Sequence, residues 1–215
     1  MNLDCEEYQT GEPLTPTDIE QDVIVSPDTR RDHRLPPGQH RTRKWPVLHA
    51  GQVPNVNFGD WDLRVWGLVH REQRWNWEGF LALRQVRVFS DFHCVTRWSR
   101  LGNLWEGVPA REIVAAAMPK SEARFVLVHA EDGWTTNLPL DDFLQEDCLF
   151  AFRHDDRPLT PDHGGPVRLI VPRLYAWKSA KWVRGVELLA RDQPGFWERG
   201  GYHMRGDPWL EERYR

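Results

Sequence analysis

The chain has 215 residues and a net charge of −4, with 40% hydrophobic and 28% charged residues. This length suits one domain with a sizeable core, and the slightly acidic balance argues against a nucleic-acid-binding surface. No apolar run reaches the roughly 20 residues that a membrane-spanning helix needs, so we expect no membrane span. The 12 tryptophans exceed average usage, and we expect most of them to fill a core built from short elements.

The N-terminal segment differs in composition from the rest of the chain. Residues 1–45 are rich in Pro, Asp, Arg and Thr and nearly free of aromatic residues. Such a segment buries too little surface to fold alone, so we expect an extended arm that lies along the domain or is mobile. Residues 46–215 are expected to form the domain, including an aromatic C-terminal tail that wraps against it. The acidic, polar N-terminus does not look like an export leader, and a cytoplasmic location is the resulting expectation.

Short strands dominate the domain, and a few helices interrupt them. Alternating apolar residues predict strands over residues 61–69, 85–95, 125–130, 134–140, 148–155, 167–172 and 183–189. Helical patterns cover residues 77–84 and 109–118, with a short helical turn at 141–145. Asp132 and Gly133 join two of the strands as a hairpin turn. These elements predict an α+β fold with mixed sheets of short strands.

Cys94 is the first candidate for chemistry, because it ends the strand predicted over residues 85–95. The three cysteines, Cys5, Cys94 and Cys148, show neither a disulfide framework nor zinc-ligand spacing. A lone cysteine is more often a small buried apolar residue than a ligand. A thiolate would need a metal or positive neighbours, such as Arg97 and His93. A regular strand would, however, turn His93 to the opposite face from Cys94.

The stretch from residue 163 to 186 is cationic and contains no acidic residue. Gly164 and Gly165 allow backbone amides to approach a ligand closely. If one helical turn follows, Lys178 and Lys181 share a face, and Ser179 adds a hydroxyl, a set that suits a phosphate. Solvated surface charges are the alternative for any single residue. The cations of this stretch are Arg168, Arg173, Lys178, Lys181 and Arg184.

Three segments, residues 91–108, 132–140 and 162–189, together resemble the sulfite-oxidase-like molybdopterin oxidoreductases. The likeness is to the short, single-domain prokaryotic members, which are related to the catalytic subunit of periplasmic methionine sulfoxide reductase. It extends from about residue 35 to the C-terminus and includes residues 195–209. The resemblance implies a sulfite-oxidase-type molybdopterin-binding fold, in which a molybdenum–molybdopterin cofactor lies in a cleft.

The resemblance also implies roles for individual residues. Cys94 is the expected thiolate ligand of molybdenum, which agrees with the preference of soft ligands for such centres. Arg97 is a second expected catalytic residue, facing the substrate. The expected cofactor contacts are His49, His93, Cys94, His163, Arg168, Ser179, Ala180 and Lys181.

The implied reaction is oxygen-atom transfer to or from sulfite, a sulfoxide or a related small molecule, with electrons exchanged with a separate redox partner. The residues after Cys94 differ from those of sulfite oxidases, so the sulfite pocket is not preserved as such. Two alternatives remain open: a non-catalytic molybdopterin-binding or electron-transfer module, and a metal-free hydrolase that uses Cys94 as its nucleophile. For the hydrolase, no residue is nominated as the base.

Overall fold

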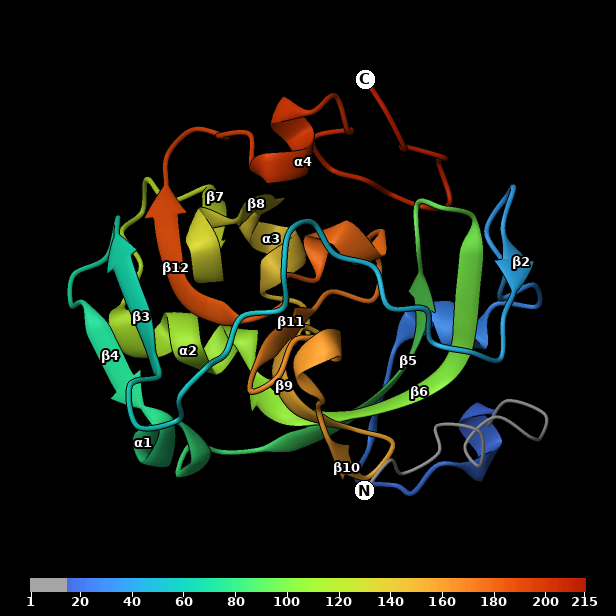
Figure 1. The fold of residues 1–215 in the computed structure, drawn as a ribbon, viewed down its shortest axis with the longest axis horizontal. Coiled ribbons are helices and arrows are strands. Elements are labelled where there is room, and N and C mark those ends of the chain that lie inside the picture. Colours follow the sequence, from blue (N-terminus) through green and yellow to red (C-terminus); the bar gives the residue numbers. More distant parts are fainter. Residues whose placement is uncertain (1–14) are drawn as a thin grey trace.

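The computed structural model describes residues 15–215, in which two mixed β-sheets carry four short α-helices (Figure 1). The larger sheet has the order β1-β5-β6-β9-β10, with β2 paired to β6 and β11 paired to β9. Its strands are β1 (Ile24–Val25), β2 (His40–Arg41), β5 (Val86–His93), β6 (Trp98–Pro109), β9 (Leu149–His154), β10 (Arg157–Pro158) and β11 (Arg168–Ile170).

The second sheet has the order β4-β3-β12-β7-β8. Its strands are β3 (Asp62–Gly67), β4 (Gln73–Asn76), β7 (Phe125–Ala130), β8 (Thr135–Pro139) and β12 (Val183–Leu189). The helices are α1 (Trp77–Leu81), α2 (Ala110–Ala117), α3 (Leu140–Phe143) and α4 (Phe196–Arg199). The α+β prediction is therefore confirmed, and the predicted strands and helices lie within a few residues of the observed ones.

The hairpin between β7 and β8 forms at the predicted dipeptide. Asp132 and Gly133 both adopt positive φ angles, 56° and 73°. Tight hairpin turns need positive φ at such positions, and Asp-Gly supplies them at low cost.

The sequence analysis missed β6, the longest strand of the described chain. Gly102, Asn103 and Gly107 lie within it, and strands are usually depleted in these residue types. Gly107 is needed because of a close approach between strands: a Cβ atom there would lie 2.1 Å from the Phe150 carbonyl oxygen of β9.

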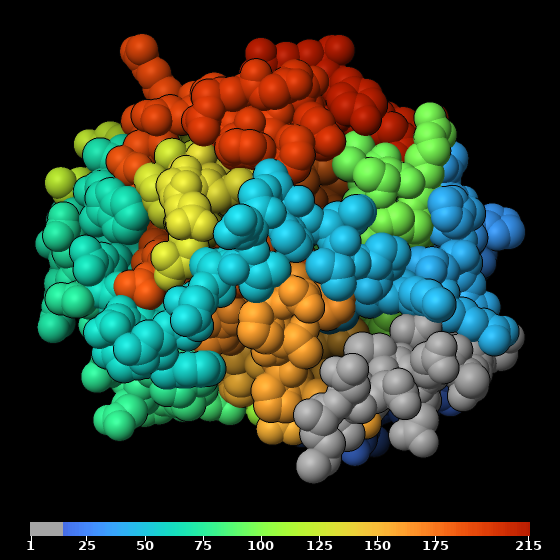
Figure 2. Space-filling model, in the orientation of Figure 1, coloured from blue at the N-terminus to red at the C-terminus, as the bar shows by residue number. Residues whose placement is uncertain are grey.

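The described part of the N-terminal arm lies along the domain and adds strands to the larger sheet. β1 pairs with β5 and β2 pairs with β6, both in parallel. The Ser26 hydroxyl donates a 2.7 Å hydrogen bond to the buried Asp147 carboxylate. The end of the arm and the residues that follow it cross one face of the molecule beside the C-terminal tail (Figure 2, cyan and red). Cys5 lies outside the described residues, and the domain boundary at residue 45 stays a prediction.

Two groups of buried apolar residues form the core. The first joins the second sheet to α2, whose Ile113, Val114 and Ala117 are buried on one face as the sequence pattern predicts. The second group surrounds Cys94 and includes Phe92, Trp98, Trp105, Tyr175 and Trp177. This second core carries the candidate site.

Candidate active site

A cavity of about 280 Å³ opens chiefly among the turn after β5, residues 163–168, the 176–182 segment, residues 45–50 and the C-terminal tail. Ligand pockets typically form in such clefts between rigid elements. Most of its walls are aromatic or apolar. The residues that line it include Trp45, His49, Cys94, Thr96, His163, Arg168, Ser179, Ala180, Lys181, Trp197 and Tyr202.

Cys94 lines this cavity from the turn that joins β5 to β6. The Cys94 amide donates to the Trp98 carbonyl at 2.8 Å, and its carbonyl accepts from the Arg97 amide at 3.0 Å. The Thr96 hydroxyl lies 3.2 Å from Cys94 Sγ, as a hydrogen-bond donor to it. Burial raises the pKa of the Cys94 thiol, while the contact with Thr96 opposes that rise. A bound metal ion would hold the sulfur as a thiolate.

His93 and Arg97 do not line the cavity, contrary to the expectation for both. His93 lies on the other face of β5, fully buried, with Nδ1 2.8 Å from the Ser99 hydroxyl. The strand alternation that separates His93 from Cys94 explains this placement. The Arg97 side chain turns toward the arm: a Cβ atom on Gly38 would lie 3.1 Å from Arg97 Nη1. Direct contact of either side chain with a group in the cavity is therefore not supported.

A cationic wall forms another side of the same cavity. Arg168 is buried, and its guanidinium donates to the His163 carbonyl at 2.8 Å and the Ser179 carbonyl at 3.0 Å. Lys181 Nζ lies beside it, 2.5 Å from the Asp162 carbonyl oxygen. His163, Arg168 and Lys181 thus meet on one side of the cavity, as the resemblance implies.

The pKa values of these three groups are all lowered, because the wall disfavours positive charge while no anion is bound. Burial lowers the pKa of Arg168 to about 9. Burial and the nearby Arg168 lower the pKa of Lys181 to about 7, and burial with Arg168 and Lys181 lowers that of His163 to about 3. An anion placed among them would oppose these effects, because it stabilises the protonated forms.

The residues present fit the phosphate end of a pterin cofactor. None of the described residues that line the cavity carries a carboxylate. Arg168 Nε and His163 Nδ1 are buried without a hydrogen-bond partner among the described residues, and buried polar atoms normally have one. A guanidinium with an unpaired donor, beside a neutral imidazole and no competing carboxylate, suits a phosphate, and Cys94 supplies the soft ligand that a molybdenum centre accepts.

The other expected contacts also lie at the cavity. Ser179 and Ala180 line it in nearly buried positions, although the Ser179 hydroxyl already accepts a hydrogen bond from the Val171 amide at 3.0 Å. The Ala180 carbonyl accepts from the Leu169 amide at 2.8 Å. His49 is exposed at the cavity mouth, with its ring 5.7 Å from that of Trp182.

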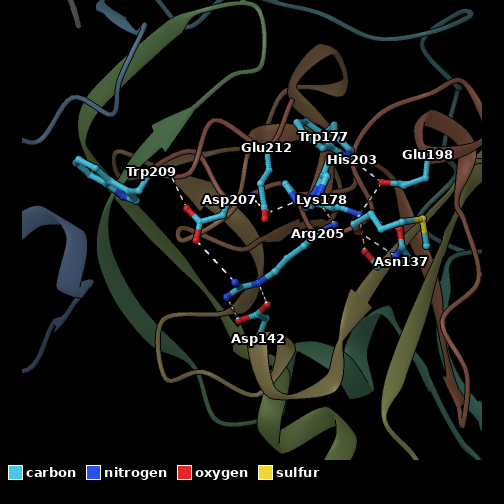
Figure 3. Close-up of polar contacts among 12 residues, drawn as sticks. Asn137, Asp142, Trp177, Lys178, Glu198, His203, Arg205, Asp207, Trp209 and Glu212 are labelled. Carbon is cyan, nitrogen blue, oxygen red and sulfur yellow. Dashed lines mark hydrogen bonds and ion pairs between the residues drawn. The ribbon is translucent and has the colours of Figure 1, made fainter. Parts of the chain in front are cut away.

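Lys178 does not belong to the cationic wall, so the expectation that it shares a phosphate-binding face with Lys181 is wrong. The segment Ala176–Lys178 is a 3-10 helix, and Lys178 points into the protein with no exposed surface. Its ammonium lies 2.6 Å from Glu198 Oε1 and 2.8 Å from Asn137 Oδ1, and it also contacts the Met204 carbonyl (Figure 3). Lys178 thereby ties the C-terminal tail to β8. Arg173 and Arg184 form ion pairs with Asp142 and Asp62 instead.

The tail that Lys178 holds supplies two walls of the cavity that the sequence analysis did not name. Trp197 precedes the anchor Glu198 on α4, and Tyr202 follows the end of this helix. Both line the cavity together with Trp177. The Tyr202 ring packs 5.2 Å from Trp177 and 5.0 Å from Trp197. Burial and the proximity of Tyr214 and Cys94 raise the pKa of the Tyr202 phenol. The family resemblance described above includes residues 195–209. That part of the resemblance is the sequence signal that could have pointed to Trp197 and Tyr202.

Comparison with known proteins gives the family. The family model of the oxidoreductase molybdopterin binding domain matches residues 50–197, which is more than half of the chain. The chain belongs to this family. It is therefore an oxidoreductase of the sulfite oxidase type, and the resemblance seen in the sequence is confirmed.

Several relatives share the domain. The chain is 52% identical over 182 residues to the uncharacterized oxidoreductase YuiH of Bacillus subtilis (strain 168), covering 84% of this chain and 92% of the relative. It is 28% identical over 167 residues to the protein-methionine-sulfoxide reductase catalytic subunit MsrP of Campylobacter jejuni, covering 67% of this chain and 54% of that protein. The chain thus spans about half of the length of MsrP.

A solved structure shows the same fold. A chain of the sulfane dehydrogenase SoxCD from Paracoccus pantotrophus superposes with a TM-score of 0.63 at 20% identity, covering 71% of this chain and 43% of that chain. At this identity the likeness concerns the fold alone. Residues 15–215 contain no helix that could cross a membrane and no cluster of three or more His, Cys, Asp or Glu side chains suited to a metal ion.

Proposed function

We propose that this oxidoreductase transfers an oxygen atom to or from a small molecule and exchanges electrons with a separate redox partner. The observation that carries the proposal is that Cys94 and the Arg168–Lys181 wall line one cavity without any carboxylate among the described lining residues. A molybdenum–molybdopterin cofactor, when bound there, supplies the metal that exchanges oxygen and electrons.

The chain's own residues have separate tasks in this proposal. Cys94 holds the molybdenum through Sγ, and the Thr96 hydroxyl orients that sulfur. Arg168, Lys181 and His163 bind the cofactor phosphate. The aromatic walls, including Trp177 and Trp197, exclude water from the reacting atoms and so strengthen electrostatic contacts inside the cavity.

We further propose that the substrate is neutral where it meets the metal. The cavity wall around Cys94 consists of Val95, Thr96, Trp98, Trp177 and Tyr202, and it lacks a cation. Arg97, the expected substrate-facing cation, turns toward Gly38 instead. A sulfoxide, as the name of MsrP indicates for that relative, fits such a wall better than the sulfite anion does. Tyr202 is the hydroxyl that we assign to the substrate oxygen. The cytoplasmic location stays a prediction.

The test compares turnover of the purified, molybdenum-loaded protein with a sulfoxide and with sulfite, using artificial electron donors and acceptors. We expect turnover with the sulfoxide and its loss in Cys94→Ala, with the fold retained. A Cys94→Ala variant that kept full molybdenum-dependent turnover would contradict the proposal. Molybdenum-loaded protein that turned over neither substrate class, nor an N-oxide, would favour a non-catalytic binding or electron-transfer module.

A further inference from the structure

Arg213, close to the C-terminus, reaches the turn that carries Cys94. The residue is 7% exposed, and Nη1 donates a 2.7 Å hydrogen bond to the carbonyl of Val95, the residue after Cys94. Nη2 lies 3.3 Å from the Pro37 carbonyl of the arm. The guanidinium also lies 5.0 Å above the Tyr175 ring. One buried cation therefore contacts the Cys94 turn, the arm and the core.

The backbone of Arg213 is linked to the opposite side of the cavity. Its carbonyl accepts a hydrogen bond from the His203 amide at 3.2 Å. The next residue, Tyr214, forms a β-bridge with Tyr202, and their rings are 5.3 Å apart. Arg213 consequently links the Cys94 turn to the Tyr202 wall.

The Cys94 turn depends on such outside support, because its own backbone is irregular. Arg97 adopts a positive φ of 74° to close it. Besides Arg213, Gln39 of the arm braces it, with Nε2 donating to the Cys94 carbonyl at 2.9 Å. These contacts are of the kind that hold a metal ligand in place from behind.

The charge of Arg213 is only partly compensated. Glu211 is the carboxylate paired with it, at 3.8 Å from Nη2, and the Glu211 side chain is 50% exposed to solvent. An exposed carboxylate at that distance is screened by water. A buried cation therefore remains beside the residue that would ligate the metal, where the lower dielectric strengthens its field.

We propose that Arg213 is a positioning residue that holds the Cys94 turn in place and raises the reduction potential of the metal bound by Cys94. The inference rests on the proposed function, since it needs molybdenum at Cys94. Reduction adds negative charge to the thiolate–metal unit, and a nearby fixed cation stabilises the reduced form more than the oxidised form.

The test is a potentiometric titration of molybdenum-loaded protein, with the Mo(V) signal followed by electron paramagnetic resonance. We expect a more negative midpoint potential in Arg213→Gln and a smaller negative shift in Arg213→Lys, which keeps the charge but loses the forked geometry. Glu211→Gln, which removes only the partly exposed counter-charge, is expected to shift the potential in the positive direction. Arg215→Gln, two residues on and exposed, is the matched control without a shift.

An Arg213→Gln protein that bound molybdenum and showed the wild-type midpoint potential and an unchanged Mo(V) signal would overturn the inference. If that variant does not fold or load, Arg213→Lys decides: a wild-type potential with an unchanged signal there also overturns it. Wild-type protein without molybdenum would instead contradict the proposed function. The two failures are therefore distinguishable.

Discussion

The Trp45 indole stacks on the His163 imidazole, with ring centroids 3.8 Å apart and an interplanar angle of 11°. The same indole lies 5.3 Å from the Arg168 guanidinium. A residue of the N-terminal arm thus covers two residues of the cationic wall, so the arm is part of the candidate active site.

Replacing Trp45 should loosen this side of the site. We expect Trp45→Ala to lower the free energy of unfolding by about 1–3 kcal/mol, from the lost burial and ring contacts, and to lower the pterin content of purified protein. Trp45→Phe is the control that keeps a stacked ring. Denaturant unfolding and cofactor fluorescence after release measure both effects, and an alanine variant with wild-type pterin content would contradict the role of the stack.

The cationic wall predicts pH-dependent anion binding in cofactor-free protein. Lys181 has its pKa lowered to about 7, so it is protonated below that pH and neutral above it. A bound anion favours the protonated form, and sulfate affinity should therefore fall by about tenfold per pH unit above pH 7. Sulfate itself does not titrate in this range.

Isothermal titration calorimetry between pH 6 and pH 8 measures this slope. Lys181→Met should bind sulfate more weakly and without the slope, because Arg168 and His163 do not change protonation across pH 6 to 8. The low pKa of His163, about 3, keeps it neutral throughout. A wild-type affinity that did not depend on pH would refute the assignment of Lys181.

The buried pair of Lys178 and Glu198 should be costly to break on one side. Both side chains have no exposed surface, and removing one partner of a buried ion pair typically costs about 3–5 kcal/mol. We expect a loss of that order in Lys178→Met, measured by urea unfolding, and recovery of part of it in the double variant with Glu198→Gln. Arg199→Met, exposed on α4, serves as the control. Equal stability of Lys178→Met and wild type would show that the pair does not anchor the tail.

Tyr202→Phe tests the hydroxyl on the substrate side of the cavity. Phenylalanine keeps the ring contacts with Trp177 and Trp197, so cofactor content should not change. Because burial raises the pKa of the phenol, it stays a hydrogen-bond donor at neutral pH. Loss of a positioned proton donor typically lowers turnover by roughly 10²-fold or more, which steady-state kinetics would detect. Unchanged kcat and kcat/KM would remove Tyr202 from the proposed mechanism.

Local patterns were sufficient to predict much of the fold and part of the site. Alternation located the strand that leads into Cys94, and the run of cations without acids pointed to Arg168 and Lys181. The same reasoning failed for Lys178, since one-dimensional spacing does not show that Glu198, 20 residues later, folds back to pair with it. Charge clustering in a sequence cannot separate cations that face a ligand from cations that anchor the fold.

Local sequence patterns could not predict the aromatic walls of the cavity, because these walls also depend on contacts between distant segments. Trp45, Trp197 and Tyr202 come from segments without regular periodicity, and only long-range packing brings them to the Cys94 turn. Arg97 was misplaced because the turn that follows Cys94 uses a positive φ at that residue, which redirects its side chain.

Elemental analysis of freshly purified protein is the most direct test of the central claim that Cys94 holds molybdenum. We predict stoichiometric molybdenum in the wild-type protein, and a lower molybdenum content in Cys94→Ser, with the pterin still bound through Arg168 and Lys181. Wild-type protein that lacked molybdenum while a thiol-reactive probe labelled Cys94 would contradict the claim and favour a metal-free thiol chemistry instead.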